Sequence, residues 1–371
     1  CKSIILMKKK LIIFMPSIED GGVEKNLFTV ANYLNKKIKN IEIITCNNDF
    51  KKKFNKKIKF IGTKNKFWNN CNKKIKYIVC LLILFKNLLF KKDKTLVFAF
   101  QANIYTIIIS KIFNTKIITR SNTSPSGWSK NIIKLFFYKY FLKSADDIMV
   151  NSKSFQEEFL KVFKIKTKCI YNPFDKNLIQ NKISKNKKNF FFKKNTLNLI
   201  SVGRLTDQKD HLTLLKSINL LRKNFKIKLY IIGNGPMHNL LTNFITDNKL
   251  ENKVQLLGYL ENPYPYINKS DIIILTSKFE GLPNILLEAQ YLKKYIISTD
   301  CPTGPNEILL NGKAGDLIKI GDYKKIAFLI SSYNKRKNTI KKKIDLGYQN
   351  FDRFDYKINC KKYLDFVIQN F

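Results

Sequence analysis

Short apolar runs alternate with longer amphipathic stretches along the first half of the chain. A continuous apolar run is typical of a strand that is buried on both faces of a parallel sheet. Such a run occupies 11–15, and further strands are predicted near 41–45, 96–100, 116–119, 147–150 and 168–171. The first predicted helix has one apolar face, formed by Leu27, Val30, Ala31 and Leu34, and further helices are expected near 102–113, 130–144 and 152–163. The alternation predicts a doubly wound α/β sheet.

The alternation lapses between Asp175 and Thr196, where the chain is rich in lysine and asparagine, and then resumes. Predicted strands of this second series lie at 197–202, 228–232, 254–257, 272–275 and 295–298. A chain of 371 residues exceeds what one core usually holds. We therefore expect a first domain at 7–174, a linker at 175–196 and a second domain at 197–350. The last segment, 351–371, has apolar side chains suited to packing on a domain.

Residues 51–94 are the most basic part of the chain and include a nearly unbroken apolar segment, Ile75 to Phe90. This segment is too short, and too often interrupted by Lys76, Lys86 and Asn87, to span a membrane. One interpretation is a helix packed on the sheet with its lysines in water. The other is a basic amphipathic segment that docks on anionic lipid. The sequence leaves both open, and the two are compatible.

The formal net charge is +42, and lysine outnumbers arginine by 64 to 5. Nucleic-acid sites favour arginine for its bidentate guanidinium, and the chain has no recognised nucleic-acid motif, so nucleic acid is not expected as a partner. The lysine excess has the character of a bias towards A/T-rich codons as much as of selection for a partner. Diffuse lysine is nonetheless enough to attract an anionic membrane surface, which we expect as a partner.

Cysteine and histidine usage limits the chemistry that is available. The seven cysteines are scattered without a CxxC pair, which fits a reducing cytosol and offers no structural zinc site. Since His211 and His238 are the only histidines, neither a multi-histidine metal site nor a histidine-rich acid–base system is available. No metal or other cofactor is expected. Met7 has the character of the natural start, with residues 1–6 an upstream extension, and the apolar run that ends at Pro16 is too short for a signal peptide.

The stretch from Phe279 to Gln290 holds two acidic residues around a predicted helix start. A predicted strand runs into it, and Pro283 suits the first helical position because its missing N–H costs nothing there. This places Glu280 in the loop and Glu288 on the helix. The backbone N–H groups of 281–285 are then expected to face outward as an anion site. Such a place suits a ligand that is both hydroxylated and negatively charged.

Two basic residues stand at the start of another predicted helix. Arg204 follows Gly203 directly after a strand, and Lys209 comes shortly afterwards. A solvated helix end would explain one basic residue in so lysine-rich a chain. Cations at a helix N-terminus oppose the helix dipole, however, so an anion bound between them would relieve that conflict. Open α/β sheets bind ligands beyond the C-terminal ends of their strands, where both residues are expected.

Gly21 and Gly22 open the first helix without the GxGxxG spacing of a dinucleotide site. A tight turn that needs a positive φ would explain Gly21. Close approach of a ligand to the backbone would explain the adjacent glycine. The sequence does not decide between these alternatives.

Four motifs in the second half of the chain together resemble glycosyltransferase family 4. They are Gly203-Arg204 with Lys209, Gly233-x-Gly235-Pro236, Glu280-Gly281-Leu282-Pro283-Asn284-x3-Glu288-Ala289 and Gly304-Pro305-Asn306-Glu307. The Gly21-Gly22-x-Glu24 loop and the stretch 121–126 are similar to those of bacterial members that extend lipid-linked or lipopolysaccharide glycans. The resemblance covers nearly the whole chain from Met7. It implies the GT-B fold, in which two Rossmann-like doubly wound parallel-sheet domains face a cleft and the last helix, here 351–371, packs back on the first domain.

The resemblance also implies a role for each matched position. Arg204 and Lys209 would hold the donor diphosphate and stabilise it as it leaves, Glu280 would contact the donor sugar, and Glu288 would bind the nucleotide ribose. The other implied donor-binding positions are Gly22, Gly233, Tyr259, Gly281, Leu282, Pro283 and Asn284. Arg204, Lys209 and Glu280 are thus the catalytic candidates. No metal is needed, because two cations and helix amides can stabilise the charge on the leaving phosphate.

One departure from the family concerns the first domain. Many relatives have a histidine there that faces the donor sugar, whereas neither histidine of this chain precedes His211. Either Arg120 or Asn122 takes its place, or the role is dispensable. Together with Gly21 and Glu24, these two residues are the candidates for acceptor binding and for the first-domain part of the site.

The resemblance therefore implies a retaining, metal-independent hexosyltransferase. Its donor is expected to be a UDP-linked sugar, and its acceptor a lipid-linked, lipopolysaccharide or capsule glycan. It would act as a peripheral protein at the cytoplasmic face of a bacterial plasma membrane. Two rival functions remain. One is a nucleotide-sugar 2-epimerase of the same fold, which needs an acid–base histidine. The other is a non-enzymatic basic membrane-associated protein with a degenerate nucleotide site.

Overall fold

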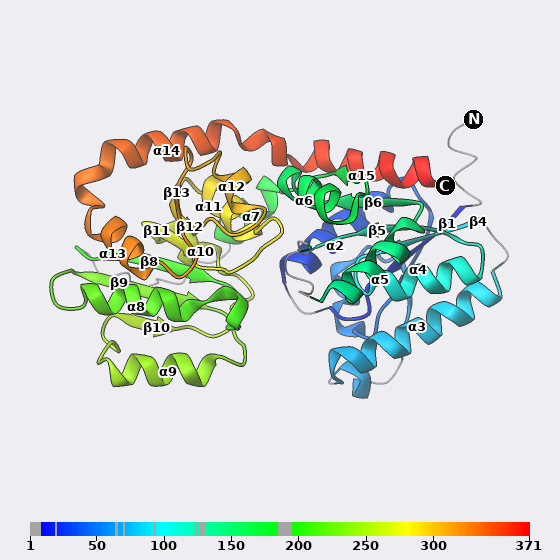
Figure 1. Cartoon of the computed structure of the whole chain (residues 1–371), viewed down its shortest axis with the longest axis horizontal. Coiled ribbons are helices and arrows are strands. Elements are labelled where there is room, and N and C mark those ends of the chain that lie inside the picture. Colours follow the sequence, from blue (N-terminus) through cyan, green and yellow to red (C-terminus); the bar gives the residue numbers. More distant parts are fainter. Residues whose placement is uncertain are drawn as a thin grey trace. The chain divides into compact units, whose positions relative to one another are not determined.

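The computed structural model describes residues 9–18, 21–63, 66–69, 71–91, 94–122, 125, 131–184 and 195–371. The chain forms two compact units (Figure 1). The first comprises Cys1–Pro173 with Tyr356–Phe371, and the second comprises Phe174–Asp355. Each unit is built on a parallel β-sheet flanked by helices. The predicted class, α/β with two parallel-sheet domains, is therefore confirmed.

The first unit contains a seven-stranded sheet in the order β3-β2-β1-β4-β5-β6-β7. Its strands are β1 (Lys9–Phe14), β2 (Asn40–Ile44), β3 (Lys59–Ile61), β4 (Lys94–Ala99), β5 (Lys116–Arg120), β6 (Asp147–Val150) and β7 (Lys168–Cys169). From β1 the chain runs outward to β3, then crosses to β4 and runs outward to β7 on the other side. The strand order thus reverses between β1 and β4, which is the kind of position where open α/β sheets bind ligands.

Alternate residues of β1 are buried in two different cores. Leu11 and Ile13 belong to the core that includes α2 (Gly22–Leu34) and α15 (Tyr356–Asn370). Ile12 and Phe14 belong to a second core on the opposite face. The helices of that second core are α3 (Lys73–Leu89), α4 (Asn103–Ile112), α5 (Ile132–Lys143) and α6 (Lys153–Phe163), and two short 3-10 helices, η1 (Asn48–Lys53) and η2 (Lys66–Asn69), complete the unit. Burial on both faces is the reason that β1 is apolar throughout.

A buried arginine fastens the C-terminal helix α15 to the first sheet. Arg120 Nε donates a hydrogen bond to Tyr363 Oη at 3.0 Å, and its Nη2 donates to Asn172 Oδ1 at 2.8 Å. The guanidinium also lies over the Phe100 ring, 5.6 Å from the ring centroid. Because Arg120 is 1% exposed, these contacts replace its hydration. The structure therefore places α15 in the first unit through both apolar packing and this polar contact.

The second unit contains a six-stranded sheet in the order β10-β9-β8-β11-β12-β13, which reverses between β8 and β11. Its strands are β8 (Leu197–Val202), β9 (Ile227–Ile232), β10 (Val254–Leu256), β11 (Ile272–Leu275), β12 (Tyr295–Thr299) and β13 (Asp316–Ile318). Its helices are α7 (Lys176–Ser184), η4 (Asp207–Lys209), α8 (His211–Leu221), α9 (His238–Asp247), α10 (Tyr264–Lys269), α11 (Asn284–Tyr291), α12 (Pro305–Ile308), α13 (Tyr323–Ser331), η5 (Asn334–Arg336), α14 (Lys337–Gln349) and η6 (Phe351–Phe354).

The predicted linker at 175–196 is wrong for its first part, because Lys176–Ser184 form helix α7 of the second unit. Gln180 Nε2 donates a hydrogen bond to Tyr291 Oη at 2.9 Å, and Asn262 Nδ2 donates to Lys182 O at 2.7 Å. The helix buries Ile179 alone among its side chains, so it lacks the apolar stripe that would have revealed it. Residues 185–194 of the predicted linker lie outside the described residues.

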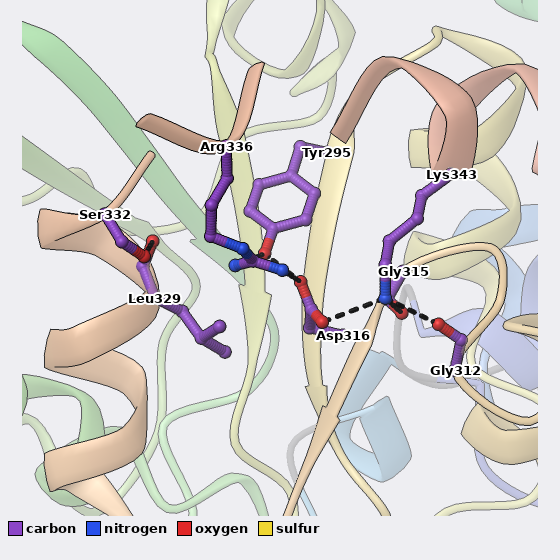
Figure 2. Close-up of polar contacts among 8 residues, drawn as sticks. All are labelled: Tyr295, Gly312, Gly315, Asp316, Leu329, Ser332, Arg336 and Lys343. Atoms are coloured by element: carbon purple, nitrogen blue, oxygen red, sulfur yellow. Dashed lines mark hydrogen bonds and ion pairs between the residues drawn. The ribbon is translucent and has the colours of Figure 1, made fainter. Parts of the chain in front are cut away.

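A charged cluster fixes the first residues of β12 and β13 to the helices that follow them (Figure 2). Asp316 accepts hydrogen bonds from Tyr295 Oη, from Arg336 Nη2 at 2.9 Å and from Lys343 Nζ at 2.9 Å. Burial disfavours ionisation of Asp316, but these three donors outweigh it and hold the pKa of the carboxyl below its ordinary value. The cluster lies at the N-terminal ends of its strands, the edge opposite the glycine-rich loops, and it anchors η5 and α14.

Candidate functional site

The candidate residues of the second unit gather in the loops that follow β8 and β11, where the strand order reverses. Three hydrogen bonds join these two loops. Thr276 Oγ1 donates to Lys209 O at 2.9 Å, the Lys278 N–H donates to Gln208 O at 2.8 Å, and Gln208 Nε2 donates to Phe279 O at 2.8 Å. The two loops therefore behave as one structural element beyond the C-terminal ends of two adjacent parallel strands. That is the expected ligand position in an open α/β sheet.

Lys209 and Glu280 form an ion pair within this double loop. Lys209 Nζ lies 2.5 Å from Glu280 Oε1, and Ser277 Oγ donates to the same oxygen at 2.6 Å. The two side chains are only 17% and 9% exposed, so little water competes for either charge. Thr303 Oγ1 donates to Glu280 O at 2.7 Å and fixes the backbone as well. The structure thus brings together a cation and an acid whose expected roles were separate.

Glu288 is buried on α11 and is oriented by a tyrosine. Tyr264 Oη donates a hydrogen bond to Glu288 Oε1 at 3.1 Å, and Tyr264 is itself buried at the start of α10. A buried carboxylate needs such donors, and this one also fixes its direction. The helix begins at Asn284, one residue later than expected. Pro283 has a ψ of 111°, which is extended, so it precedes the helix and does not occupy its first position.

Glycine at two positions lets the loops of this unit lie directly against one another. Gly233 has a φ of 147°, and a Cβ there would lie 1.9 Å from Gly203 O. Gly304 has a φ of 79°, and a Cβ there would lie 2.0 Å from Gly281 O. Both positions therefore require glycine for packing alone. Since Gly281 and Leu282 are buried beneath this contact, the amide row expected to face outward at 281–285 is largely covered, and Asn284 is its partly exposed member.

Arg204 and Tyr259 differ from the other candidates of the second unit because both are exposed. Arg204 follows β8, and Tyr259 follows β10 one residue after Gly258. Backbone hydrogen bonds from Gly203 N to Ile232 O and from Gly233 N to Gly258 O, at 2.9 and 2.8 Å, hold the three loops side by side. The second unit therefore presents one buried charge pair, one buried acid and two exposed side chains at the same edge of its sheet.

Sequence reasoning passed over several residues that support this site. Ser277 and Thr303 bind Glu280, and Tyr264 binds Glu288, but none of the three belongs to a motif that drew attention. Ser277 had a usable signal, because Thr276-Ser277 is a polar pair that directly follows an apolar strand and precedes Glu280. Tyr264 had no such signal.

His211 is the ionisable group nearest in sequence to Lys209 whose pKa is strongly displaced. It is the first residue of α8, it is 3% exposed, and its Nδ1 is buried without a hydrogen-bond partner in the part of the chain that the structure describes. Burial, with a smaller contribution from the Lys209 charge, lowers its pKa to about 4. His211 is therefore uncharged near neutral pH.

The first-unit candidates near α2 have ordinary backbone geometry. Gly21 precedes the helix with a φ of −97° and a ψ of −174°, an extended conformation that any residue adopts. The prediction that Gly21 needs a positive φ is therefore wrong. Gly22 is the exposed first residue of the helix, so the alternative of close backbone approach remains for it. Glu24 is buried on the same helix.

The two candidates that follow β5 separate in the structure. Asn122 Nδ2 donates a hydrogen bond to Phe100 O at 2.7 Å, so this half-buried side chain lies at the end of β4, beside the reversal of the first sheet. Arg120 instead is buried against α15, where its Nε donates to Tyr363 and its Nη2 to Asn172, while its Nη1 has no partner among the described residues. The expectation that Arg120 replaces a sugar-facing histidine is not supported by this position. Its contacts give it a structural role, and Asn122 is the better placed of the two.

The fold and the site define a class. Residues 182–348 match the family model described as glycosyl transferases group 1, a segment that includes Arg204, Lys209, Glu280 and Glu288. The crystal structure of the Anabaena protein Alr3699/HepE in complex with UDP and glucose superposes with a TM-score of 0.78 at 18% identity, over 97% of this chain and 99% of that one. The chain therefore has the GT-B fold, and its second unit carries a group 1 glycosyltransferase domain.

Two curated relatives extend the comparison. An uncharacterized glycosyltransferase of Methanocaldococcus jannaschii is 35% identical over 240 residues, which is 59% of this chain and 58% of the relative. The chain thus aligns with little more than half the length of that protein. The N-acetylgalactosamine-N,N'-diacetylbacillosaminyl-diphospho-undecaprenol 4-alpha-N-acetylgalactosaminyltransferase of Campylobacter jejuni is 27% identical over 327 residues, 84% of this chain and 86% of the relative. Both relatives are glycosyltransferases by name.

Proposed function

We propose that the protein is a retaining glycosyltransferase that moves a sugar from a UDP-linked donor to a lipid-linked glycan. The observation that carries the proposal is the Lys209–Glu280 ion pair, held at the strand reversal of a group 1 glycosyltransferase domain. UDP is chosen because HepE is described with UDP and glucose. A lipid-linked acceptor is chosen because the name of the Campylobacter relative contains a diphospho-undecaprenol.

In the proposed reaction, the bond between the anomeric carbon of the sugar and a diphosphate oxygen breaks, and the bonding electrons leave with UDP. An acceptor hydroxyl forms the new bond on the same face of the sugar, and its proton passes to a phosphate oxygen of the leaving UDP. Negative charge grows on the phosphate oxygens as this happens, and Lys209 and Arg204 are the cations proposed to stabilise it. Glu280 holds the Lys209 ammonium in place and is itself held by Ser277, so little reorganisation is required during the step. The scheme needs no resident metal or other cofactor.

The two acids have different proposed tasks. Glu288 accepts hydrogen bonds from the ribose hydroxyls of UDP. A carboxylate can accept several hydrogen bonds, so ribose can add to the bond that Tyr264 already donates. Glu280 contacts the transferred sugar while it orients Lys209. The exposed Tyr259 is proposed to contact the base, and Gly22 is proposed to let the backbone approach the donor diphosphate. Glu24 and Asn122 belong to the acceptor side in this scheme.

The two rival functions are less well supported. A nucleotide-sugar 2-epimerase needs a histidine that exchanges protons, and His211 is buried with its pKa lowered to about 4. A degenerate nucleotide site would not be expected to keep a cation and an acid paired and only 17% and 9% exposed at the strand reversal.

The direct test is turnover of a panel of UDP-sugars by the full chain, with and without an undecaprenyl-diphosphate-linked acceptor. We expect UDP release that depends on acceptor, a glycolipid with the anomeric configuration of the donor, and the same rate in the presence of EDTA. Epimerised free sugar would refute the proposal in favour of the epimerase. Absence of any donor binding would refute it in favour of the non-enzymatic alternative.

Variants of the site separate binding from catalysis. Glu288→Gln should weaken UDP binding by roughly tenfold to a hundredfold, the cost of hydrogen bonds to a charged group. The matched control is Glu251→Gln, an exposed acid of the same unit, which should leave UDP affinity unchanged. Arg204→Ala should lower kcat more than it lowers UDP affinity, because the phosphate charge is larger in the transition state. Unchanged UDP affinity in Glu288→Gln, or a pure KM effect in Arg204→Ala, would contradict these roles.

A further inference from the structure

Three neighbouring helices of the first unit present apolar side chains to solvent. Helix α4 contacts both α3 and α5, and the three lie side by side over one face of the first sheet (Figure 1). Soluble proteins seldom expose a contiguous apolar surface of this extent unless something covers it. The spacing of the exposed apolar side chains and the charge of the three helices indicate which kind of partner covers them.

Helix α3 has two apolar stripes on opposite sides. Its inner stripe, Cys80, Leu84 and Leu88, is buried in the core beneath it. The outer stripe recurs every three or four residues and is between 39% and 65% exposed; it consists of Ile75, Ile78, Leu82, Phe85 and Leu89. A helix that only covers a sheet has polar residues on its outer side. The interpretation as a helix packed on the sheet is confirmed for the inner side, although Lys76 is buried there and does not face water. Docking of the outer side on lipid stays a prediction.

Helices α4 and α5 continue this outer surface. On α5, four side chains share one face at positions i, i+3, i+4 and i+7, and they are 46% to 79% exposed; they are Ile133, Phe136, Phe137 and Tyr140. On α4, Tyr105 and Ile112 are 56% and 65% exposed. Aromatic and aliphatic side chains are thus exposed on all three helices.

The charge on these helices has a single sign. Their lysines outside the core are Lys73, Lys74 and Lys86 on α3, Lys111 on α4, and Lys134, Lys139 and Lys143 on α5, and of these Lys111 forms an ion pair with Asp146 at 2.8 Å. None of the three helices contains an Asp or Glu. Apolar side chains mixed with lysine, without acids, are complementary to an anionic bilayer, since the apolar groups enter the interface while the ammonium groups meet the headgroups. A second copy of this chain would bring lysine against lysine and is disfavoured for that reason.

We propose that the outer face of α3, α4 and α5 docks on an anionic lipid bilayer. No helix within the described residues is long and apolar enough to cross a membrane, so the docking is interfacial, with the helices lying in the headgroup region. The docking surface itself does not depend on the proposed function. Only its biological purpose rests on that function, because docking would hold the active site near a membrane-borne acceptor.

The test measures binding of the full chain to vesicles of phosphatidylcholine alone and of phosphatidylcholine with phosphatidylglycerol. We expect binding to the anionic vesicles, weakened by salt. Leu82→Ser and Phe136→Ser remove exposed side chains and should each reduce binding by roughly tenfold. Leu220→Ser and Phe328→Ser are the matched controls, because these residues are also about half exposed but lie on helices of the second unit, and they should bind as the wild type does.

Three results would refute the docking proposal. The first is equal vesicle binding by all four variants, and the second is vesicle binding that does not depend on lipid charge. The third is a concentration-dependent dimer that forms without lipid and is abolished by both Leu82→Ser and Phe136→Ser. The last would assign the face to contacts between copies of the chain. Vesicle binding needs no turnover, so failure of the glycosyltransferase proposal would leave this result unchanged. If both proposals hold, the two variants lose transfer to a vesicle-borne acceptor and keep transfer to a water-soluble one.

Discussion

Acidification from about pH 7.5 to about pH 5 should destabilise the second unit through His211. This imidazole is 3% exposed at the start of α8, and its Nδ1 has no hydrogen-bond partner among the described residues. Burial, and secondarily the charge of Lys209, lower its pKa from 6.5 to about 4. Protonation in the folded state would therefore place a charge in an apolar surrounding next to another cation.

The sign and the size follow from proton linkage. Because the folded pKa lies below the unfolded one, the unfolded state binds more protons between pH 6.5 and pH 4, and stability falls as the pH falls through that interval. The loss between about pH 7.5 and about pH 5 is about 2 kcal/mol. The full difference of pKa corresponds to about 3 kcal/mol, which is reached only below pH 4.

The assay must report the second unit separately. Both tryptophans, Trp68 and Trp128, precede Phe174, so intrinsic fluorescence does not follow that unit. Hydrogen exchange of peptides from α8 and β9, measured by mass spectrometry at both pH values, gives its opening free energy. In His211→Leu most of the 2 kcal/mol loss should disappear, and stability near neutral pH should be equal or higher, because the unpartnered nitrogen is gone.

His238→Leu serves as the control for loss of an exposed histidine elsewhere in the same unit. If the wild type and His211→Leu lost the same stability on acidification, the explanation through a buried neutral imidazole would be wrong. Strong destabilisation of His211→Leu near neutral pH would show that Nδ1 has a stabilising hydrogen-bond partner after all.

Two further predictions concern the frame around the site. Tyr363→Phe removes the acceptor of the buried Arg120 Nε and should destabilise the first unit by about 1.5–3 kcal/mol in urea unfolding followed by fluorescence, whereas Tyr140→Phe on an exposed tyrosine should change nothing. Equal stability of these two variants would show that the Arg120 contact contributes little. Asp316→Asn leaves Lys343 facing a neutral amide and should cost about 2 kcal/mol in the second unit by hydrogen exchange, with UDP affinity unchanged, since the cluster lies at the opposite edge of the sheet. A large loss of UDP affinity would mean that the two edges are coupled.

The fold class and most of the helices and strands could be predicted from the amino-acid sequence alone. Strands such as β1, β8 and β11 are buried on both faces, so their apolar runs were visible without any tertiary information. The predicted helices near 102–113, 130–144 and 152–163 end within two residues of α4, α5 and α6. Two edge strands, β3 and β13, and the polar helix α7 were missed, because they bury too few side chains to create a periodic signal.

The candidate site was determined in part. The motifs identified Arg204, Lys209, Glu280 and Glu288 as candidates, because each lies in the loop after a predicted strand or on the helix that follows that loop. The tertiary structure decided which of them meet. Lys209 and Glu280 are 71 residues apart in sequence, and they become neighbours because the strand order places β8 beside β11. No local pattern encodes that order.

The same limit applies to Arg120. Its position in the sequence made it a site candidate, but in the structure it donates a hydrogen bond to Tyr363, 243 residues away, and so anchors α15 to the first sheet. The outer stripe of α3 was visible as an apolar run, but only the packed structure shows which of its side chains face the sheet and which face solvent. The spacing of apolar residues indicates how much of each helix or strand is buried. Which other element covers it depends on long-range strand order and helix packing, and those are properties of the folded chain as a whole.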